Sequence, residues 1–272
     1  MSGHAPCYCR RRLNISLISW GRVLAGGRKR RLMLRSHNPG HQFERQSLLM
    51  RIAISGVNRG IGEGLALAAL DRGDKVIGFG RKAPSWADDS ASAFRFIECD
   101  MAEAAELARA CNSVADPIDV LVCSAARFAS GAGTIEHFHP DAMREAFAVN
   151  VIAPLVMARA LRSSLDAGNR RLIVMMSTGN ASIEGNRTGT LLGYRLSKTA
   201  LNQAARTLAA EWGPAGFTVV ALNPGWVRTD MGGPNGELSI EQASGQIFEF
   251  IERVTHADNG SFVNTDGSRL PW

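Results

Sequence analysis

The stretch RIAISGVNRGIGEGLALAALDRG, residues 51–73, decides how this chain folds. Residues 51–55 form a short apolar run, which predicts a buried strand. Gly56, Gly60 and Gly62 follow, and then an apolar run with helical spacing that ends at Gly73. Glycines between a strand and a helix let a pyrophosphate approach the backbone N–H groups at the helix start, although turns and helix packing also use glycine. The stretch predicts the first unit of a dinucleotide-binding fold.

The same alternation continues to the end of the chain. Further strands are predicted at 75–80, 93–100, 118–125, 170–177, 217–223 and 261–263, with helices at 103–114, 141–165, 194–212 and 239–254. Strands that alternate with helices of this length need crossover connections, and the resulting parallel sheet is covered on both faces. We therefore predict an α/β fold over residues 50–272: a Rossmann-type, doubly wound parallel sheet of seven strands in a single domain.

Composition excludes several classes of protein. The 272 residues are 45% hydrophobic and 21% charged, as in an ordinary globular protein. No stretch reaches the roughly 18 consecutive apolar residues of a membrane span. The five cysteines are an odd number without a paired framework, which indicates a reducing compartment, and we expect a cytoplasmic protein. Cys7-x-Cys9 and His137-x-His139 each lack a second ligand pair, so no metal is expected.

The basic charge belongs to the first 49 residues. They contain ten Lys or Arg and one acid, Glu44, whereas the remainder holds 21 basic and 24 acidic residues. Three interpretations of residues 1–49 stay open: a nucleic-acid-binding arm, a transit peptide, or upstream sequence that is never translated, since Met50 directly precedes the first strand. We treat 1–49 as a basic extension outside the fold, either disordered or a mis-assigned start.

One tyrosine and one lysine form an unusual pair. The chain has two tyrosines and four lysines, and Lys198 follows Tyr194 by four residues. That spacing places both side chains on one face of the 194–212 helix, although a surface pair would have the same spacing. Asp100, Ser177-Thr178 and Asn223–Gly225 lie at predicted strand ends, where ligands bind in such sheets. We expect these groups to form one site.

These motifs together resemble the short-chain dehydrogenase/reductase family. Gly-x3-Gly-x-Gly followed by Tyr-x3-Lys is its signature, and the similarity extends along residues 50–272. Asn150 in FAVNVIAP matches the family's mid-helix asparagine, and NPGWVRTDMGG (223–233) matches its segment beside the nicotinamide. The ending DGSRLPW and the insert SIEGNRTG (182–189) resemble the branch of the C-factor and the sniffer-type carbonyl reductases.

The resemblance implies a catalytic set of Tyr194, Lys198, Thr178 and Asn150. Tyr194 would donate a proton to the substrate oxygen, and Lys198 would bring its pKa toward neutrality and hold the ribose. Thr178 would hydrogen-bond the reacting oxygen, with Ser177 beside it as the alternative hydroxyl. Asn150 would hold a water that connects Lys198 to solvent. One departure from the family is Cys123-Ser-Ala-Ala126, where the family has Asn-Asn-Ala-Gly.

The resemblance also implies the cofactor contacts. They are Gly56, Asn58, Arg59, Gly60, Ile61, Gly62, Arg81, Asp100, Met101, Ala125, Tyr194, Lys198, Pro224, Gly225, Val227 and Thr229. No Asp or Glu occurs from 75 to 87, where an acid would bind the ribose hydroxyls of NAD. Arg59 and Arg81-Lys82 suit a 2′-phosphate, although an arginine-rich chain also places Arg on loops. We expect NADP(H) rather than NAD(H).

The function expected is an NADP(H)-dependent oxidoreductase that acts on CH–OH or C=O groups of a small carbonyl or alcohol substrate, in the manner of a carbonyl reductase. The alternative is a cofactor-binding signalling protein of the C-factor type with incidental catalysis. A nucleic-acid binder is disfavoured because residues 50–272 are net acidic. Helices 141–165 and 194–212 would form the family's dimer or tetramer face. The sequence does not name the substrate.

Overall fold

The computed structural model describes residues 49–87, 93–129, 133–137 and 139–272, and the expectations for residues 1–48 lie outside this part of the chain. One seven-stranded sheet, parallel throughout, organises the described residues, with the strand order β3-β2-β1-β4-β5-β6-β7. The strands are β1 (Arg51–Ser55), β2 (Lys75–Gly80), β3 (Phe94–Glu98), β4 (Val120–Cys123), β5 (Leu172–Met176), β6 (Thr218–Asn223) and β7 (Phe262–Asn264). The predicted Rossmann-type α/β fold is confirmed.

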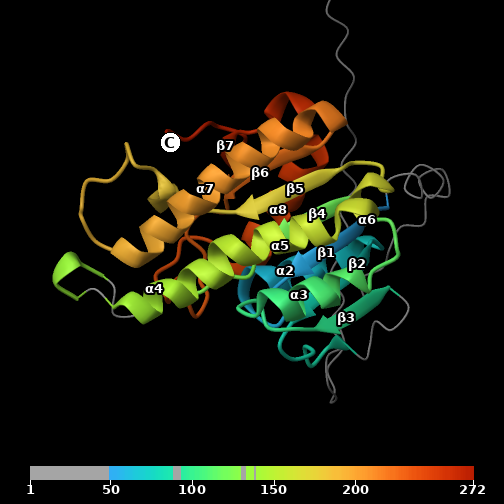
Figure 1. The fold of residues 1–272 in the computed structure, drawn as a ribbon, viewed down its shortest axis with the longest axis horizontal. Coiled ribbons are helices and arrows are strands. Elements are labelled where there is room, and N and C mark those ends of the chain that lie inside the picture. The colour runs from blue at the N-terminus through green and yellow to red at the C-terminus, as the bar shows by residue number, and fades with distance from the viewer. Residues whose placement is uncertain (1–48, 88–92, 130–132, 138) are drawn as a thin grey trace, which may run out of the picture. The chain divides into compact units, whose positions relative to one another are not determined.

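Helices pack on both faces of this sheet (Figure 1). α3 (Ala104–Asn112), α5 (Ala153–Ala160) and α7 (Leu192–Trp212) cover one face, and α2 (Gly60–Arg72) and α8 (Ile240–Arg253) cover the other. The central strands are buried on both sides because helices cover both, which explains their continuous apolar runs. α2 ends where Gly73 takes a φ of 89°, a left-handed conformation that glycine adopts without strain.

The predicted helix 141–165 is interrupted, which corrects the sequence expectation. α4 (Pro140–Phe147) leads into a π-helical segment, η4 (Ala148–Ile152), and then into α5; α6 (Arg162–Asp166) follows after Leu161. Each piece keeps helical apolar spacing, so periodicity alone does not reveal the breaks. Single π turns inside helices are rare and are found mostly at functional sites. This one centres on Asn150.

The two edges of the sheet are protected differently. At β7 the chain turns back after Asn264, and Leu270 N donates to Phe262 O at 2.8 Å while Val263 bridges Arg269 in antiparallel register. The opposite edge, β3, carries the exposed residues Arg95 and Glu98. A charged edge strand resists pairing with another chain, and a covered one has no free edge to offer.

Among the described helices, none combines the length and the apolar character needed to cross a bilayer.

Candidate active site

The glycine turn after β1 is packed so tightly that side chains are excluded. A Cβ on Gly62 would lie 2.2 Å from the carbonyl oxygen of Gly56, and a Cβ on Gly56 would lie 2.9 Å from Cα of Ala125. Gly56 and Gly60 also have φ values of 77° and 62°. The turn therefore brings bare backbone to the start of α2, and this cradle fits a dinucleotide pyrophosphate.

The turn is joined to the neighbouring strand ends. Ala125 N donates to the Ser55 hydroxyl at 3.0 Å, which ties the end of β4 to the end of β1. Asn58 lies beside the end of β2, since a Cβ on Gly80 would fall 2.3 Å from its Oδ1. Thr229 lies over the turn, because a Cβ on Gly60 would be 3.5 Å from its Cγ2. Three segments distant in sequence thus meet at the carboxyl edge of the sheet.

The two arginines predicted to hold a 2′-phosphate differ in their surroundings. Arg59 Nη1 donates to Asp230 Oδ2 at 2.8 Å, and both side chains are at least 70% exposed, so the pair contributes little to stability and separates easily. Arg81 follows β2 and is exposed, with no ion pair or side-chain hydrogen bond to the described residues.

The remaining predicted contacts also lie along this edge. Asp100 follows β3; its Oδ1 accepts from Ala102 N at 2.9 Å and its own N–H donates to Glu106. Met101 is buried. Gly225, with a φ of 82°, turns the chain after β6, and Val227 is buried where it bridges Leu238. Ile61 and Pro224 are the other predicted contacts, at the start of α2 and just after β6.

Tyr194 and Lys198 project from the first turns of α7. Lys198 is 2% exposed, and its Nζ donates to the carbonyl oxygen of Met176, the last residue of β5, at 2.8 Å. Tyr194 is half-buried, with the ring of Phe128 5.3 Å away between centroids. The two residues therefore lie one helical turn apart, as their spacing in the sequence predicts, and α7 places both side chains near the end of β5.

The electrostatics of this pair correct the expectation that Lys198 lowers the pKa of Tyr194. Burial raises the pKa of the Tyr194 phenol to about 12, and a hydrogen bond from Thr178 offsets this only in part. Burial lowers the pKa of the Lys198 ammonium to about 8. Loss of hydration disfavours the charged form of both groups, and the Nζ is directed at Met176. The site therefore holds Tyr194 as a neutral phenol.

The two candidate hydroxyls beside β5 have different partners. Ser177 is buried, and its hydroxyl donates to Asn202 Oδ1 at 2.6 Å. Thr178 lies close enough to Tyr194 to lower the pKa of its phenol, and its Oγ1 accepts from Asn180 N at 3.3 Å, capping the short helix η5 (Gly179–Ala181). Thr178, not Ser177, is therefore the hydroxyl beside the phenol.

Asn150 is fully buried, and its side chain is occupied. Oδ1 accepts from Arg127 N at 2.8 Å, and Nδ2 donates to Arg127 O and to the Ser197 hydroxyl, each at 2.9 Å. Both amide hydrogens are thereby used. Asn150 fastens the segment after β4 to α7, and its own backbone lies in the π segment, where the regular helical hydrogen bonding is interrupted.

The structure also describes the segment Cys123-Ser-Ala-Ala126, which stands where the family has Asn-Asn-Ala-Gly. Cys123 is buried, and burial raises the pKa of its thiol to about 12, so it behaves as a small apolar group. Cys99 and Cys111 are likewise free and buried. Among the described residues no cluster of three His, Cys, Asp or Glu has the arrangement of a metal site.

Four functional residues were not found from the sequence. Phe128 lies against Tyr194, and Ser197 links Asn150 to the carbonyl of Tyr194. Arg195 holds the loop after η5 through Thr190 O and Asn180 O, at 2.8 and 3.2 Å. Asn202 binds Ser177. Ser197 and Asn202 lie three and eight residues after Tyr194, so the helical period could have found them, whereas Arg195 lies directly after Tyr194 and has no such signal.

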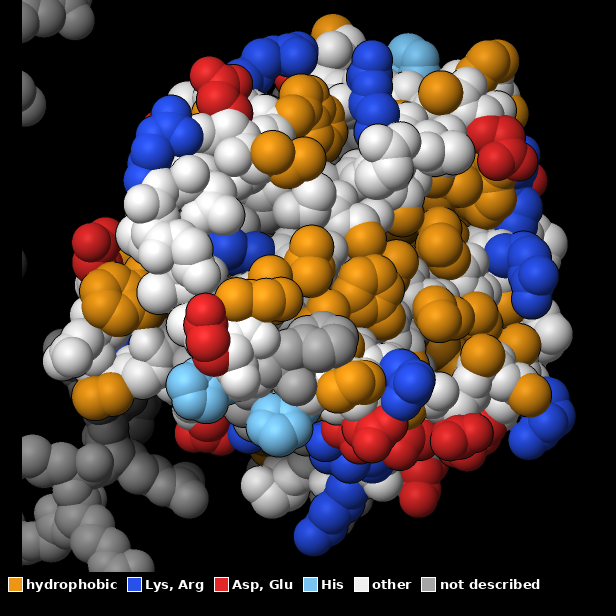
Figure 2. All heavy atoms as spheres, turned by 60° about the vertical axis from the view of Figure 1, so that its left-hand side comes forward, with side chains coloured by type: hydrophobic (Ala, Val, Ile, Leu, Met, Phe, Trp, Pro, Cys, Tyr) orange, Lys and Arg blue, Asp and Glu red, His pale blue; other side chains and the backbone are white. Residues whose placement is uncertain are grey.

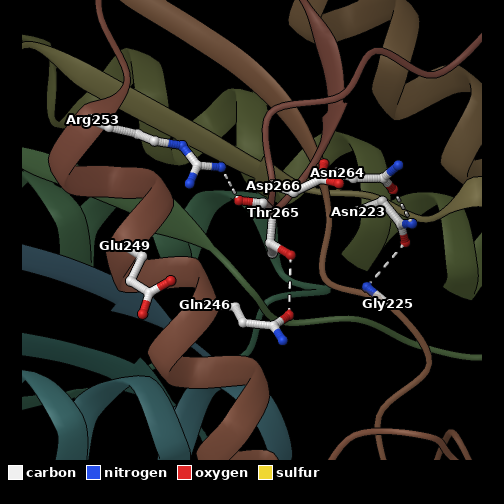
Figure 3. A pocket seen from close by; sticks show the side chains of 8 residues that line it. All are labelled: Asn223, Gly225, Gln246, Glu249, Arg253, Asn264, Thr265 and Asp266. Atoms are coloured by element: carbon white, nitrogen blue, oxygen red, sulfur yellow. Dashed lines mark hydrogen bonds between the residues drawn. The ribbon is translucent and has the colours of Figure 1, made fainter. Parts of the chain in front are cut away.

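A separate hollow of about 450 Å³ lies between α8 and the turn after β7 (Figure 3). It is lined by Asn223, Gly225, Gln246, Glu249, Arg253, Asn264, Thr265 and Asp266. Its polar groups largely bind one another: Asn223 Nδ2 donates to Asn264 Oδ1 at 2.8 Å, and Thr265 donates to Gln246 Oε1 at 3.2 Å. Gly225 is the one member shared with the predicted cofactor contacts, so this hollow is not the reaction site.

Comparison with known proteins agrees with this geometry. A sequence model of the family described as enoyl-(acyl carrier protein) reductase matches residues 56–257, which include the glycine turn and the Tyr194–Lys198 helix. The chain belongs to the short-chain dehydrogenase/reductase family. Members of this family are oxidoreductases that use nicotinamide cofactors.

Three relatives are informative. The C-signal of Myxococcus xanthus is 32% identical over 163 residues, which cover 60% of this chain and 98% of that protein. The carbonyl reductase Sniffer of D. melanogaster superposes with a TM-score of 0.77 at 28% identity, over 82% of this chain and 100% of the other. The NADPH-bound carbonyl reductase from chicken fatty liver gives 0.73 at 25% identity, over 82% and 99%. These similarities support an oxidoreductase activity.

Proposed function

We propose that this protein is an NADP(H)-dependent reductase of small carbonyl compounds. The observation that carries the proposal is the arrangement at the carboxyl edge of the sheet: Lys198 on α7 donates to Met176 O at 2.8 Å, and the half-buried Tyr194, one turn earlier on that helix, lies beside Thr178. A nicotinamide cofactor, when bound, supplies the hydride. Tyr194 then donates the proton that the substrate oxygen needs, and Thr178 holds that oxygen by a hydrogen bond. A neutral phenol is the correct protonation state for a proton donor, so this arrangement favours reduction.

The proton that Tyr194 gives up has to be replaced. Lys198 is the nearest candidate on α7, and its lowered pKa allows it to lose and regain a proton near neutral pH. The side chain of Asn150 is hydrogen-bonded to Arg127 and Ser197. Its backbone carbonyl, which lies in the π segment, is therefore the group of Asn150 that would bind a water between Lys198 and solvent.

The preference for NADP(H) over NAD(H) rests on Arg81 and Arg59. Arg81 has no ion-pair partner among the described residues, and the exposed pair between Arg59 and Asp230 releases its arginine at little cost. A 2′-phosphate between the two guanidinium groups would gain bidentate, charge-assisted hydrogen bonds. NADPH in the chicken carbonyl reductase is consistent with this preference.

Phe128 suggests the kind of carbonyl substrate. Its ring is 38% exposed and tilted by 33° against the ring of Tyr194. A carbonyl that accepts a proton from Tyr194 would therefore have its substituent beside an aromatic surface, which favours planar or aromatic substituents. We propose aromatic aldehydes, aryl ketones and quinones as the first substrates to test.

The test is NADPH oxidation by the full chain against aromatic and aliphatic aldehydes, ketones and quinones, with Tyr194→Phe as the matched control. We expect turnover of at least one aromatic member by the parent and a loss in the variant. The absence of Tyr194-dependent turnover across the panel, in protein that binds NADPH, would refute the proposal.

A second candidate is a cofactor-binding signalling protein, favoured by the similarity to the C-signal of Myxococcus xanthus and by Cys123-Ser-Ala-Ala126. It predicts that any biological activity follows NADPH binding and is unaffected by Tyr194→Phe. The same variant therefore separates the two functions.

We further propose a cytoplasmic protein that pairs through its α5–α7 face. Ile152, Leu155 and Leu196 are 48%, 38% and 45% exposed, and a shallow apolar groove runs between Leu155 and residues 200–211 of α7. Figure 2 shows apolar side chains over much of the visible surface.

Residues 1–49 are proposed to lie outside the catalytic domain, residues 50–272.

A further inference from the structure

Asn202 occupies a position where an apolar residue would be expected. It lies on the buried face of α7, is 2% exposed, and is followed by the core residues Ala205 and Leu208. Its Nδ2 has no hydrogen-bond partner among the described residues. A buried donor without a partner destabilises the fold, and asparagine is also a weak helix former. Stability alone therefore does not explain an asparagine here.

What Asn202 does bind is the residue before Thr178. The Ser177 hydroxyl donates to Asn202 Oδ1 at 2.6 Å, and both side chains are buried. Lys198, one helical turn earlier, donates to Met176 O at 2.8 Å. Thr199 donates to Ala181 O, at the end of η5, at 2.8 Å. The first half of α7 thus fixes the chain at Met176, Ser177 and Ala181.

Thr178 lies inside this series of fixed points. Its backbone continues β5 in an extended conformation, with φ −165° and ψ 152°, and then begins η5. Besides its contact with Tyr194, the Thr178 hydroxyl accepts one hydrogen bond, from Asn180 N at 3.3 Å. The backbone on either side is held by Ser177 N to Leu222 O at 2.7 Å and by Ala181 N to Thr178 O at 2.9 Å, and the Ser177–Asn202 bond is the side-chain contact that fixes the residue directly before Thr178.

We propose that Asn202 is a positioning residue, which acts through Ser177 to hold the Thr178 hydroxyl against the Tyr194 phenol. Its effect on turnover rests on the proposed reductase function, whereas its effect on the Thr178–Tyr194 contact does not. Without this bond the end of β5 gains freedom, and an error of about 1 Å at a reacting group is enough to slow a reaction about a hundredfold.

Two substitutions remove the bond from opposite ends. We expect Asn202→Leu to change the melting temperature little, because it removes the unpartnered Nδ2 but leaves the Ser177 hydroxyl without its acceptor, while kcat falls at least tenfold and NADPH affinity stays within twofold. Ser177→Ala should lower kcat to a similar extent, but its melting temperature should fall, because both polar atoms of the buried Asn202 amide then lack partners. Because both remove one bond, the double variant should lose no more kcat than the worse single variant. Ser113→Ala, which removes an exposed hydroxyl bound to Ala110 O at 2.7 Å, is the matched control.

The contact itself can be followed without turnover. With two tyrosines in the chain, ¹³Cζ-tyrosine labelling gives two NMR signals, and Tyr194→Phe assigns them. Thr178→Val should move the Tyr194 signal, and Asn202→Leu and Ser177→Ala should move it in the same direction. If Thr178→Val moves the signal while the other two leave it in place, the positioning role is refuted, whatever the protein catalyses. If the losses of kcat in the two single variants multiply in the double variant, the positioning role of Asn202 is refuted as well.

Discussion

At the scale of single residues, the site places a phenol and an ammonium where neither is readily charged. Tyr194 and Lys198 lose hydration on the same face of α7, and the resulting pKa shifts, to about 12 and about 8, are opposite in sign. Each shift favours the neutral form of its group. Tyr194 therefore stays protonated at neutral pH, while the pKa of Lys198 lies close enough to neutrality for it to lose and regain a proton.

The first prediction concerns the proton donor. Tyr194→Phe keeps the ring beside Phe128 but removes the hydroxyl, so kcat should fall at least about a hundredfold while NADPH affinity changes little. Lys198→Arg should be nearly as damaging although it keeps a positive charge, because a guanidinium is too broad for the buried place beside Met176. Steady-state kinetics and NADPH titration measure both effects. A Tyr194→Phe protein that turns over as fast as its parent would exclude Tyr194 as the donor.

The second prediction concerns pH and stability. The pKa of Lys198 is about 8 when folded and 10.5 as its ordinary value, so the unfolded chain binds more protons between these limits. Lys198 therefore makes the free energy of unfolding rise with pH from about 8 to 10.5, by up to roughly 1.4 kcal/mol per pH unit. Urea unfolding of the parent and of Lys198→Met at pH 7.5 and 9.5 tests this. The variant should lack that part of the rise, and identical pH dependence in both proteins would contradict the assigned shift.

At the scale of elements, the carboxyl edge of the sheet collects groups that are distant in sequence. The glycine turn contacts Ala125 and Thr229, and Asn58 of that turn lies beside Gly80 at the end of β2, directly before Arg81. We therefore expect cofactor selectivity to depend on the β2 end and the turn together.

The third prediction follows from that arrangement. NADPH should bind at least tenfold more tightly than NADH, a difference of about 1.4 kcal/mol. Arg81→Asp should narrow or reverse the ratio, because a carboxylate repels the 2′-phosphate and binds ribose hydroxyls. Lys75→Asp, at the exposed amino end of β2, reports the general effect of charge. Equal affinities of the parent for NADPH and NADH would contradict the preference.

The sequence was sufficient to predict most helices and strands, but not the interruption within one of the helices. The alternation of short apolar runs and helical runs was sufficient for the parallel sheet. The break at Ala148–Ile152 was missed because a π turn keeps the apolar spacing on both sides of it. The Tyr194–Lys198 pair was found from its spacing, whereas the rise of the Tyr194 pKa through burial was not, because adjacency in sequence does not report burial. Asn202 was missed because its importance depends on Ser177, which belongs to another element.

At the scale of the whole molecule, Met50 is the first described residue with contacts to the core. The Met50 N–H donates to the buried Asp74 Oδ1 at 2.9 Å, and its carbonyl accepts from Lys75 N at the same distance. Met50 is itself buried in the cluster beneath α2 and α8. Residue 50 is thus the first for which the structure provides core packing.

The fourth prediction tests the extension. A protein that begins at Met50 should keep the melting temperature and the NADPH affinity of the full chain, because the described core and the proposed cofactor contacts lie within residues 50–272. Thermal unfolding and NADPH titration of the two proteins give the comparison. A loss of more than about 1 kcal/mol, large for a marginally stable domain, would show that residues 1–49 support the fold.

The turn after β7 has a consequence for how this protein can be handled and joined to others. Because residues 268–270 already occupy the hydrogen-bonding groups of the last strand, an incoming peptide would have to displace them before it could extend the sheet there. Arg95 and Glu98 oppose extension at the far end. Assembly is therefore directed to helical surfaces, and a tag attached after Trp272 pulls on the segment that seals the sheet, whereas one attached before Met50 does not.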